Sequence, residues 1–237
     1  MTATECLFRD RHHAGQVLAE RLAHYRNQPG LLVLALPRGG VVVGFEVARA
    51  LDAALDILVV RKLGFPGCEE IAMGAIASGP AGAVQVMNPL TSQRVKPAAL
   101  AAVLAREHAE LTRREQRYRA QRPAPVLQGR SVIVVDDGLA TGATLRAALL
   151  AISRQQPQHL AVAVPVGASE SCAALRQQAD AVICAEMPEP FHAIGLWYLD
   201  FAQTTDAEVC ALLQQAWREH PVAASMKVPA DRAQPPE

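Results

Sequence analysis

The sequence predicts an α/β protein with an open, mainly parallel five-stranded sheet flanked by helices, together with a small hood and a flexible loop or hairpin. Short aliphatic runs alternate with amphipathic helical stretches, as in βαβ units. About half of the 237 residues are hydrophobic but only 4% are aromatic, which suits helices packed on a parallel sheet. One run, residues 132–135, contains only Val and Ile, as expected for a strand covered on both faces.

The predicted elements follow from these patterns in chain order. Five strands are predicted at residues 31–36, 57–60, 132–135, 159–166 and 181–184. Helices are predicted after the capping residue Asp10 and over residues 41–51, 97–119, 145–150, 170–178 and 208–217. Residues 64–70 are predicted to form a mobile loop, and residues 71–78 and 83–87 a hairpin. The strands ending at Leu36 and Val135 should be neighbours where the strand order reverses, which is where ligands bind in such sheets.

Length and composition bound the organisation of the chain. We expect one domain over residues 1–220, with a core of about 31–186 and a hood from about 1–28 and 187–220. Residues 221–237 are rich in Pro and Ala, which predicts a disordered tail. The 23 basic residues equal the 23 acidic ones, so no nucleic-acid partner is expected. No apolar run is long enough to predict a membrane span, and five scattered cysteines predict free thiols in the cytoplasm.

The most informative stretch is residues 132–144, where a strand leads into Asp136-Asp137 and then into Gly138-Leu139-Ala140-Thr141-Gly142-Ala143-Thr144. Small residues before a helix let backbone N–H groups approach a phosphate, which the helix dipole also favours. The two Thr residues add hydroxyl donors. Two adjacent carboxylates suit sugar hydroxyls or a hard cation. The stretch therefore predicts a sugar-phosphate site, and the simpler alternative is an ordinary strand-to-helix turn with an N-cap.

A second loop, Pro37-Arg38-Gly39-Gly40, repeats the arrangement of strand, small residues and helix start, with a fixed cation added. Arg38 and the N–H groups of Gly39 and Gly40 could clasp a second anion. The alternative is a tight turn with a surface arginine. The presence of the later loop favours the anion site.

Residues 132–144 resemble the phosphoribosyl-diphosphate signature of the type I phosphoribosyltransferases, and the resemblance extends over about residues 31–201. It implies that Asp136 and Asp137 hold the ribose hydroxyls, with Mg²⁺ as cofactor near them. It also implies that the loop ending at Thr144 holds the 5-phosphate and that the loop of residues 37–40, often with a non-proline cis peptide, holds the diphosphate. Lys62 resembles the family's basic residue near the diphosphate.

The resemblance implies transfer of ribose 5-phosphate from phosphoribosyl diphosphate to a nitrogenous base, with a homodimer as a candidate assembly. Asp136, Asp137, Lys62 and Arg38 are the candidate catalytic residues. Ala140 stands where 6-oxopurine salvage enzymes carry an Asp, which argues against hypoxanthine or guanine as the acceptor. In the family a variable hood grips the base, so Trp197, Tyr198 and Asp200 are candidate contacts. Alternatively, these aromatic residues close the core.

A second hypothesis is a non-catalytic sensor that binds phosphoribosyl diphosphate or a nucleotide and regulates a partner. Such a sensor needs an interface, and the arginine-rich stretch of residues 113–122 is the candidate for it. Without interleaved aromatic residues, a basic stretch of this kind is more often a solvated helix face. Arg38, Lys62 and a loop able to close favour catalysis.

Overall fold

A computed structural model describes residues 6–79, 82–120 and 122–220 of the chain. The tail predicted at residues 221–237 lies outside the described residues. None of the helices in these ranges is long and apolar enough to cross a bilayer.

The body of the molecule is built on five parallel strands, which confirms the predicted sheet. In spatial order they are β2 (Ala54–Ile57), β1 (Leu32–Ala35), β6 (Ser131–Val135), β7 (His159–Val166) and β8 (Ala181–Glu186). Every residue of β1 and β6 is buried, because helices cover both faces of the sheet. Ala35 pairs with Val135, so β1 and β6 are neighbours as predicted. The strand order reverses between them, and the site must therefore lie beyond their carboxyl ends.

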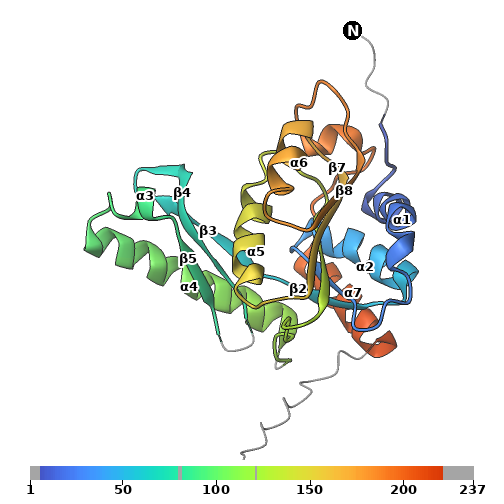
Figure 1. The fold of residues 1–237 in the computed structure, drawn as a ribbon, viewed down its shortest axis with the longest axis horizontal. Helices are drawn as coiled ribbons and strands as arrows, with labels where there is room; N and C mark the ends of the chain where they lie inside the picture. The colour runs from blue at the N-terminus through green and yellow to red at the C-terminus, as the bar shows by residue number, and fades with distance from the viewer. Residues whose placement is uncertain (1–5, 80–81, 121, 221–237) are drawn as a thin grey trace, which may run out of the picture.

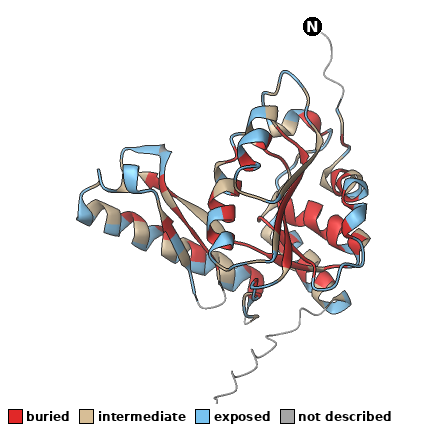
Figure 2. Cartoon of the chain, in the orientation of Figure 1, coloured by how far each residue is buried: buried red, intermediate tan, exposed pale blue. Residues whose placement is uncertain are grey.

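Helices cover the two faces of this sheet (Figure 1). One face packs against α1 (Arg11–Arg21), α2 (Gly39–Leu51) and α7 (Asp206–Glu219), and the other against α5 (Ala143–Ser153) and α6 (Ser169–Leu175). Two short 3₁₀ helices cover Ala23–Tyr25 and Ile194–Trp197. Asp10 caps α1 as predicted, because its carboxylate accepts a hydrogen bond from the His13 N–H. Buried residues concentrate on the sheet and the helix faces toward it (Figure 2).

A second unit, which we call the arm, extends away from the body (Figure 1). It consists of β3 (Val60–Phe65), β4 (Cys68–Ala77) and β5 (Val84–Met87) in one antiparallel sheet, with α3 (Pro89–Ser92) and the long α4 (Pro97–Arg119). The predicted hairpin of residues 71–78 and 83–87 is confirmed by the pairing of β4 with β5. The long helix predicted at 97–119 is also confirmed.

The prediction that residues 64–70 form a loop is wrong. Phe65 pairs with Cys68 across the turn formed by Pro66 and Gly67, so this segment is the hairpin that joins β3 to β4. Gly67 has φ +80°, a conformation that glycine adopts without strain. The strand predicted at residues 57–60 is also displaced, because β2 covers Ala54–Ile57 and Val60 already belongs to β3.

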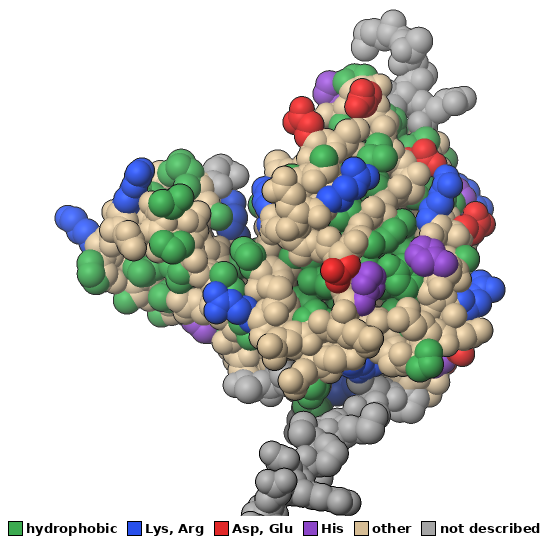
Figure 3. Space-filling view, in the orientation of Figure 1, with side chains coloured by type: hydrophobic (Ala, Val, Ile, Leu, Met, Phe, Trp, Pro, Cys, Tyr) green, Lys and Arg blue, Asp and Glu red, His purple; other side chains and the backbone are tan. Residues whose placement is uncertain are grey.

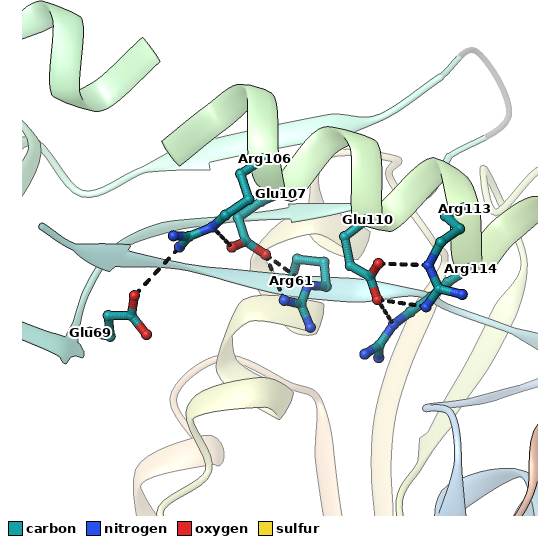
Figure 4. A network of polar contacts seen from close by, with 7 residues as sticks. All are labelled: Arg61, Glu69, Arg106, Glu107, Glu110, Arg113 and Arg114. Carbon is teal, nitrogen blue, oxygen red and sulfur yellow. Dashed lines mark hydrogen bonds and ion pairs between the residues drawn. The ribbon is translucent and has the colours of Figure 1, made fainter. Parts of the chain in front are cut away.

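Ion pairs fasten the arm together (Figure 4). Arg61 of β3 contacts the buried Glu107 of α4 at 2.7 Å, which joins the sheet of the arm to its long helix. Within α4, Glu110 pairs with Arg113 and Arg114. The basic stretch that we considered as an interface is thus partly engaged inside the molecule. Further members of the stretch pair with Asp206 (Arg117) and with Asp56 (Arg119).

Candidate functional site

Two loops meet at the carboxyl ends of β1 and β6. The first, which we call the Gly39 loop (residues 37–40), leads into α2 through a cis peptide between Pro37 and Arg38. A methyl group built on Gly39 would lie 1.9 Å from Asp137 Oδ2, and one on Gly40 would lie 2.9 Å from the Val135 carbonyl oxygen. Glycine is therefore required here because the loop lies directly against the acidic pair, Asp136 and Asp137.

The second loop, the Thr141 loop (residues 138–144), connects β6 to α5. Gly142 has φ +72° and precedes Ala143, the first residue of α5. Thr141 and Thr144 are exposed, which leaves their hydroxyls accessible. Hydrogen bonds join Leu139 in both directions to the end of β7 at 2.9 Å, through the Val166 carbonyl and the Ala168 N–H. The loop is thus held in place while its helix N-terminus faces outward, the arrangement that favours an anion.

Arg11 is part of this site although sequence reasoning missed it. Its Nε donates to Asp137 Oδ2 at 2.8 Å, and the two side chains are only 11% and 16% exposed. Its guanidinium also donates to the Ala202 carbonyl and lies 3.9 Å from the centre of the Phe201 ring. These three contacts fix a positive charge between the acidic pair and the Gly39 loop.

The two carboxylates have different environments. Burial, and then the neighbouring Asp137 carboxylate, raise the pKa of Asp136 well above the ordinary aspartate value. The Asp137 N–H, which donates to Asp136 Oδ1, and the Arg11 charge oppose this rise. Burial therefore disfavours the charged form of Asp136, while Arg11 lies beside Asp137. Such a pair can accept hydrogen bonds from two neighbouring hydroxyls.

The two predicted cations lie in different surroundings. Arg38 precedes Gly39 and is therefore beside the acidic pair along the chain, but its side chain points toward Asp206 of α7, with 3.7 Å between the charged atoms. Lys62 was expected at the end of a strand of the main sheet. In the structure it lies within β3 of the arm. It lines a cavity together with Ala143, the start of α5.

The three predicted base contacts differ in their exposure to solvent: two are buried and one is exposed. Trp197 and Tyr198 are 8% and 4% exposed and belong to a small core cluster with Phe8. The Tyr198 hydroxyl donates to the Asp137 backbone carbonyl at 2.6 Å, so this ring supports the acidic pair from behind. Asp200 is exposed. The burial of both rings favours the alternative that they close the core, which they do beside Phe8 and Ala14 of the N-terminal segment.

A cavity of about 970 Å³ adjoins the Thr141 loop. It lies between this loop, the start of α6 and the segment that follows β8. Phe191 contributes a partly exposed ring, which stacks on Trp197 with 6.4 Å between ring centres. Glu170 and Glu189 also line the cavity. Its walls therefore combine an aromatic face with two carboxylates that accept hydrogen bonds.

The acidic pair fits a magnesium ion that is bound mainly by a ligand. In the described part of the chain, no group of three or more His, Cys, Asp or Glu side chains is placed to hold a metal. Mg²⁺ usually keeps several waters and takes one or two carboxylates together with substrate phosphates. Asp136 and Asp137 meet that requirement.

Comparisons with known proteins agree with this geometry. Residues 11–198 match the family model described as the phosphoribosyl transferase domain. A protein of Mycobacterium tuberculosis strain H37Rv, whose name assigns it provisionally as a phosphoribosyl transferase, is 42% identical over 227 residues, and strain CDC 1551 has a relative with the same identity. The match covers 95% of this chain but only 50% of each relative, so the chain spans about half their length.

A solved structure is similar along nearly its whole length. The crystal structure of TT1426 from Thermus thermophilus superimposes with a TM-score of 0.78 and 43% sequence identity. The match covers 88% of this chain and 98% of that one. Most of this chain therefore shares its fold with an experimentally determined structure.

Proposed function

Because this chain belongs to the phosphoribosyl transferase domain family, we propose that it transfers ribose 5-phosphate from phosphoribosyl diphosphate to a nitrogenous base and releases diphosphate. The observation that carries this proposal is the contact between the Gly39 loop and Asp137. This contact brings the Gly39 loop against the carboxylates that precede the Thr141 loop, which supports the proposal that two anion-binding loops flank one acidic pair. A sugar that carries a phosphate at one end and a diphosphate at the other matches that order of groups.

Each part of the site has a role in the proposed reaction. The Thr141 loop, through the N–H groups and hydroxyls from Ala140 to Thr144, binds the 5-phosphate. Asp136 and Asp137 accept hydrogen bonds from the ribose hydroxyls, and the Gly39 loop binds the diphosphate. Arg11, already within 2.8 Å of Asp137, keeps that carboxylate oriented.

Catalysis requires stabilisation of the leaving diphosphate, because the sugar carbon becomes oxocarbenium-like as the bond breaks. Arg38 and Lys62 are the proposed cations for this charge. Arg38 would have to turn from Asp206, a contact whose 3.7 Å separation makes it weak. Lys62 would approach with the arm. Closure of the arm would also exclude water, which otherwise hydrolyses the reactive sugar.

We propose Mg²⁺ as the cofactor, held by the substrate's oxygens together with Asp136 and Asp137, directly or through water. When bound, the ion supplies positive charge that neutralises the diphosphate.

The five free cysteines support the expectation that the reaction takes place in the cytoplasm.

The acceptor base is proposed to enter the cavity beside the Thr141 loop. Phe191 offers a ring face on which a flat base can stack, and Trp197 supports that ring from behind. Glu170 and Glu189 favour a base that presents N–H donors. Asp200 stays a predicted contact at the rim.

The proposal is tested by incubating the full chain with Mg²⁺, phosphoribosyl diphosphate and a panel of bases while diphosphate release is measured. We expect release that depends on one class of base. Release without any base would indicate a hydrolase, and binding without release would favour the sensor hypothesis. Either result contradicts the proposed transfer.

The double variant Asp136→Asn/Asp137→Asn tests the assigned site directly. It should lower the affinity for phosphoribosyl diphosphate at least tenfold, because the carboxylates that accept hydrogen bonds from the ribose hydroxyls are replaced by amides. Asp52→Asn is the matched control, since Asp52 lies at the far end of α2 and Asn tolerates its left-handed backbone. Equal affinity in the double variant and the control would refute the assignment.

A further inference from the structure

A second large cavity lies between the arm and the body. We call it the arm cleft; its volume is about 800 Å³, which is within the range of small-molecule sites. One wall is the sheet of the arm, and the other is the outer face of α5. Figure 3 shows the hollow between the two units, with Lys and Arg side chains at its edges.

The charges around the arm cleft have one sign. Lys62 comes from β3, Arg146 comes from α5, and Arg154 is the C-cap residue of α5. No Asp or Glu is among the described residues that line the cleft. Within the described ranges, neither arginine makes an ion pair, so their charge is available to a ligand. An anion that enters would meet the positive charge of Arg146 and Arg154 along one wall.

The surface between these cations is apolar. Val86 and Met87 contribute to it from the arm, and Ala147 and Leu150 from α5. Leu150 is 44% exposed, which is unusual for a leucine on a helix face that looks toward another element of the same chain. A ligand made only of phosphate would leave this surface uncovered, whereas a ring attached to the phosphate would cover it.

At its Ala143 end the cleft adjoins the Thr141 loop, and from there it extends along α5 away from the acidic pair. It follows α5 from Ala143 to Arg154, a length of about 16 Å at 1.5 Å per residue. Its Arg154 end is near Gln178, at the opposite end of α5 from the Thr141 loop. A ligand held by Arg154 and Leu150 therefore need not contact the loop that would hold the 5-phosphate.

We propose that the arm cleft binds a second ligand, a small organic anion in which a phosphate is joined to a flat apolar ring, as in a nucleotide. Its phosphate pairs with Arg154 and its ring covers Leu150 and the facing strand residues. Since the ligand contacts both walls, it holds the arm against α5. The inference depends on the charges and the cavity alone, not on the proposed transferase reaction.

The test is calorimetric titration of the full chain with AMP, GMP and UMP, with and without saturating phosphoribosyl diphosphate and Mg²⁺. We expect at least one nucleotide to bind at one equivalent in the presence of phosphoribosyl diphosphate. Arg154→Glu should weaken this binding at least tenfold, because an attraction becomes a repulsion. Arg176→Glu, which makes the same charge change on exposed surface at the end of α6, should leave it unchanged.

Leu150→Gln tests the contribution of the ring to binding separately from that of the phosphate. It should weaken the nucleotide severalfold, while inorganic phosphate, used as a second probe, binds weakly to both proteins. The affinity for phosphoribosyl diphosphate should be the same in Arg154→Glu as in the unsubstituted chain. Failure of all three nucleotides to bind, or binding that is indifferent to Arg154→Glu, would overturn the proposal. Because no turnover is measured, a chain without transferase activity can still satisfy it.

Discussion

At the scale of single residues, Arg11 is the side chain whose role the structure changes most. Arg11→Ala removes the partner of Asp137 and the charge beside the Gly39 loop. Hydrogen bonds to charged groups contribute about 1.5–3 kcal/mol, so we expect a loss of at least tenfold in kcat/KM for phosphoribosyl diphosphate. The kinetics of diphosphate release measure this loss.

A conservative variant separates charge from geometry at this position. Arg11→Lys keeps the charge but cannot reach Asp137, the Ala202 carbonyl and the Phe201 ring with one planar group, so it should recover only part of the loss. Arg21→Ala, at the exposed end of the same helix with a 3.7 Å contact to Glu186, is the matched control. If both alanine variants behave alike, Arg11 only supports the helix.

The place of the acidic pair and the Thr141 loop between a buried strand and a helix could be predicted because all of their residues are contiguous in the sequence. Arg11 could not be predicted. It contacts Asp137 across 126 positions of sequence, and a charged residue in the first turn of a helix is ordinarily a surface residue. The burial of Tyr198 could not be predicted for the same reason, since only the folded chain shows that Phe8 and the N-terminal segment cover it.

At the scale of elements, the attachment of α4 to the body depends on a buried ion pair. Arg119 Nη1 lies 2.7 Å from Asp56 Oδ1, with both side chains almost fully buried. Burial raises the pKa of Asp56 despite the arginine charge, so desolvation outweighs the attraction. Arg119→Met would leave this carboxylate without its partner, and we expect a loss of about 3–5 kcal/mol in the free energy of unfolding. Urea denaturation measures it.

Removing both members of the pair should be less harmful than the single change. Asp56→Val/Arg119→Met replaces two desolvated charges by apolar side chains, a change that is often neutral or stabilising. The double variant should therefore be more stable than Arg119→Met alone. A further loss in the double variant would show that the pair itself, rather than the unpaired charge, decides the stability.

The contact between α4 and α7 should make the free energy of unfolding depend on pH. The hydrogen bond from Tyr118, followed by the charges of Arg117 and Arg38, holds the pKa of Asp206 below the ordinary aspartate value. A depressed pKa stabilises the fold at pH above about 4 and loses that effect as the pH falls through the folded value. Asp206→Asn should thus cost up to about 1 kcal/mol at pH 6 and progressively less below pH 4, as measured by denaturation across that range.

Glu208→Gln controls for the helix dipole, since Glu208 also lies in the first turn of α7 but Asp206 makes the ion pairs. A matching pH dependence in both variants would assign the effect to the dipole instead of to the cluster around Tyr118.

The elements of the main sheet could be predicted because long aliphatic runs have few alternative structures. The β3–β4 hairpin could not, since Gly64, Pro66 and Gly67 fit a loop equally well. What decides between them is pairing with β4 and packing on α4, through contacts such as Arg61–Glu107. Lys62 was misplaced for the same reason. The strand predicted at residues 57–60 placed Lys62 at the edge of the main sheet, whereas it belongs to β3 of the arm.

At the scale of the whole molecule, the proposed site joins parts that are far apart in the chain. Arg11 lies in the N-terminal helix, the Gly39 loop starts α2, and the acidic pair ends β6. A ligand that contacts all three binds only the folded state, and it therefore shifts the unfolding equilibrium by mass action. At 100 times its dissociation constant, such a ligand adds about 2.7 kcal/mol.

We therefore expect phosphoribosyl diphosphate with Mg²⁺ to raise the melting temperature by about 5–10 °C, given a shift of about 2–4 °C per kcal/mol for a chain of this size. Chelation of Mg²⁺ should remove most of this shift, because the acidic pair alone does not neutralise the diphosphate. In scanning calorimetry the Asp136→Asn/Asp137→Asn variant should show at most about half of this shift at the same ligand concentration, because a tenfold weaker ligand adds only about 1.4 kcal/mol. An equal shift in that variant would mean that the ligand binds elsewhere, and the role given to the two carboxylates would then be wrong.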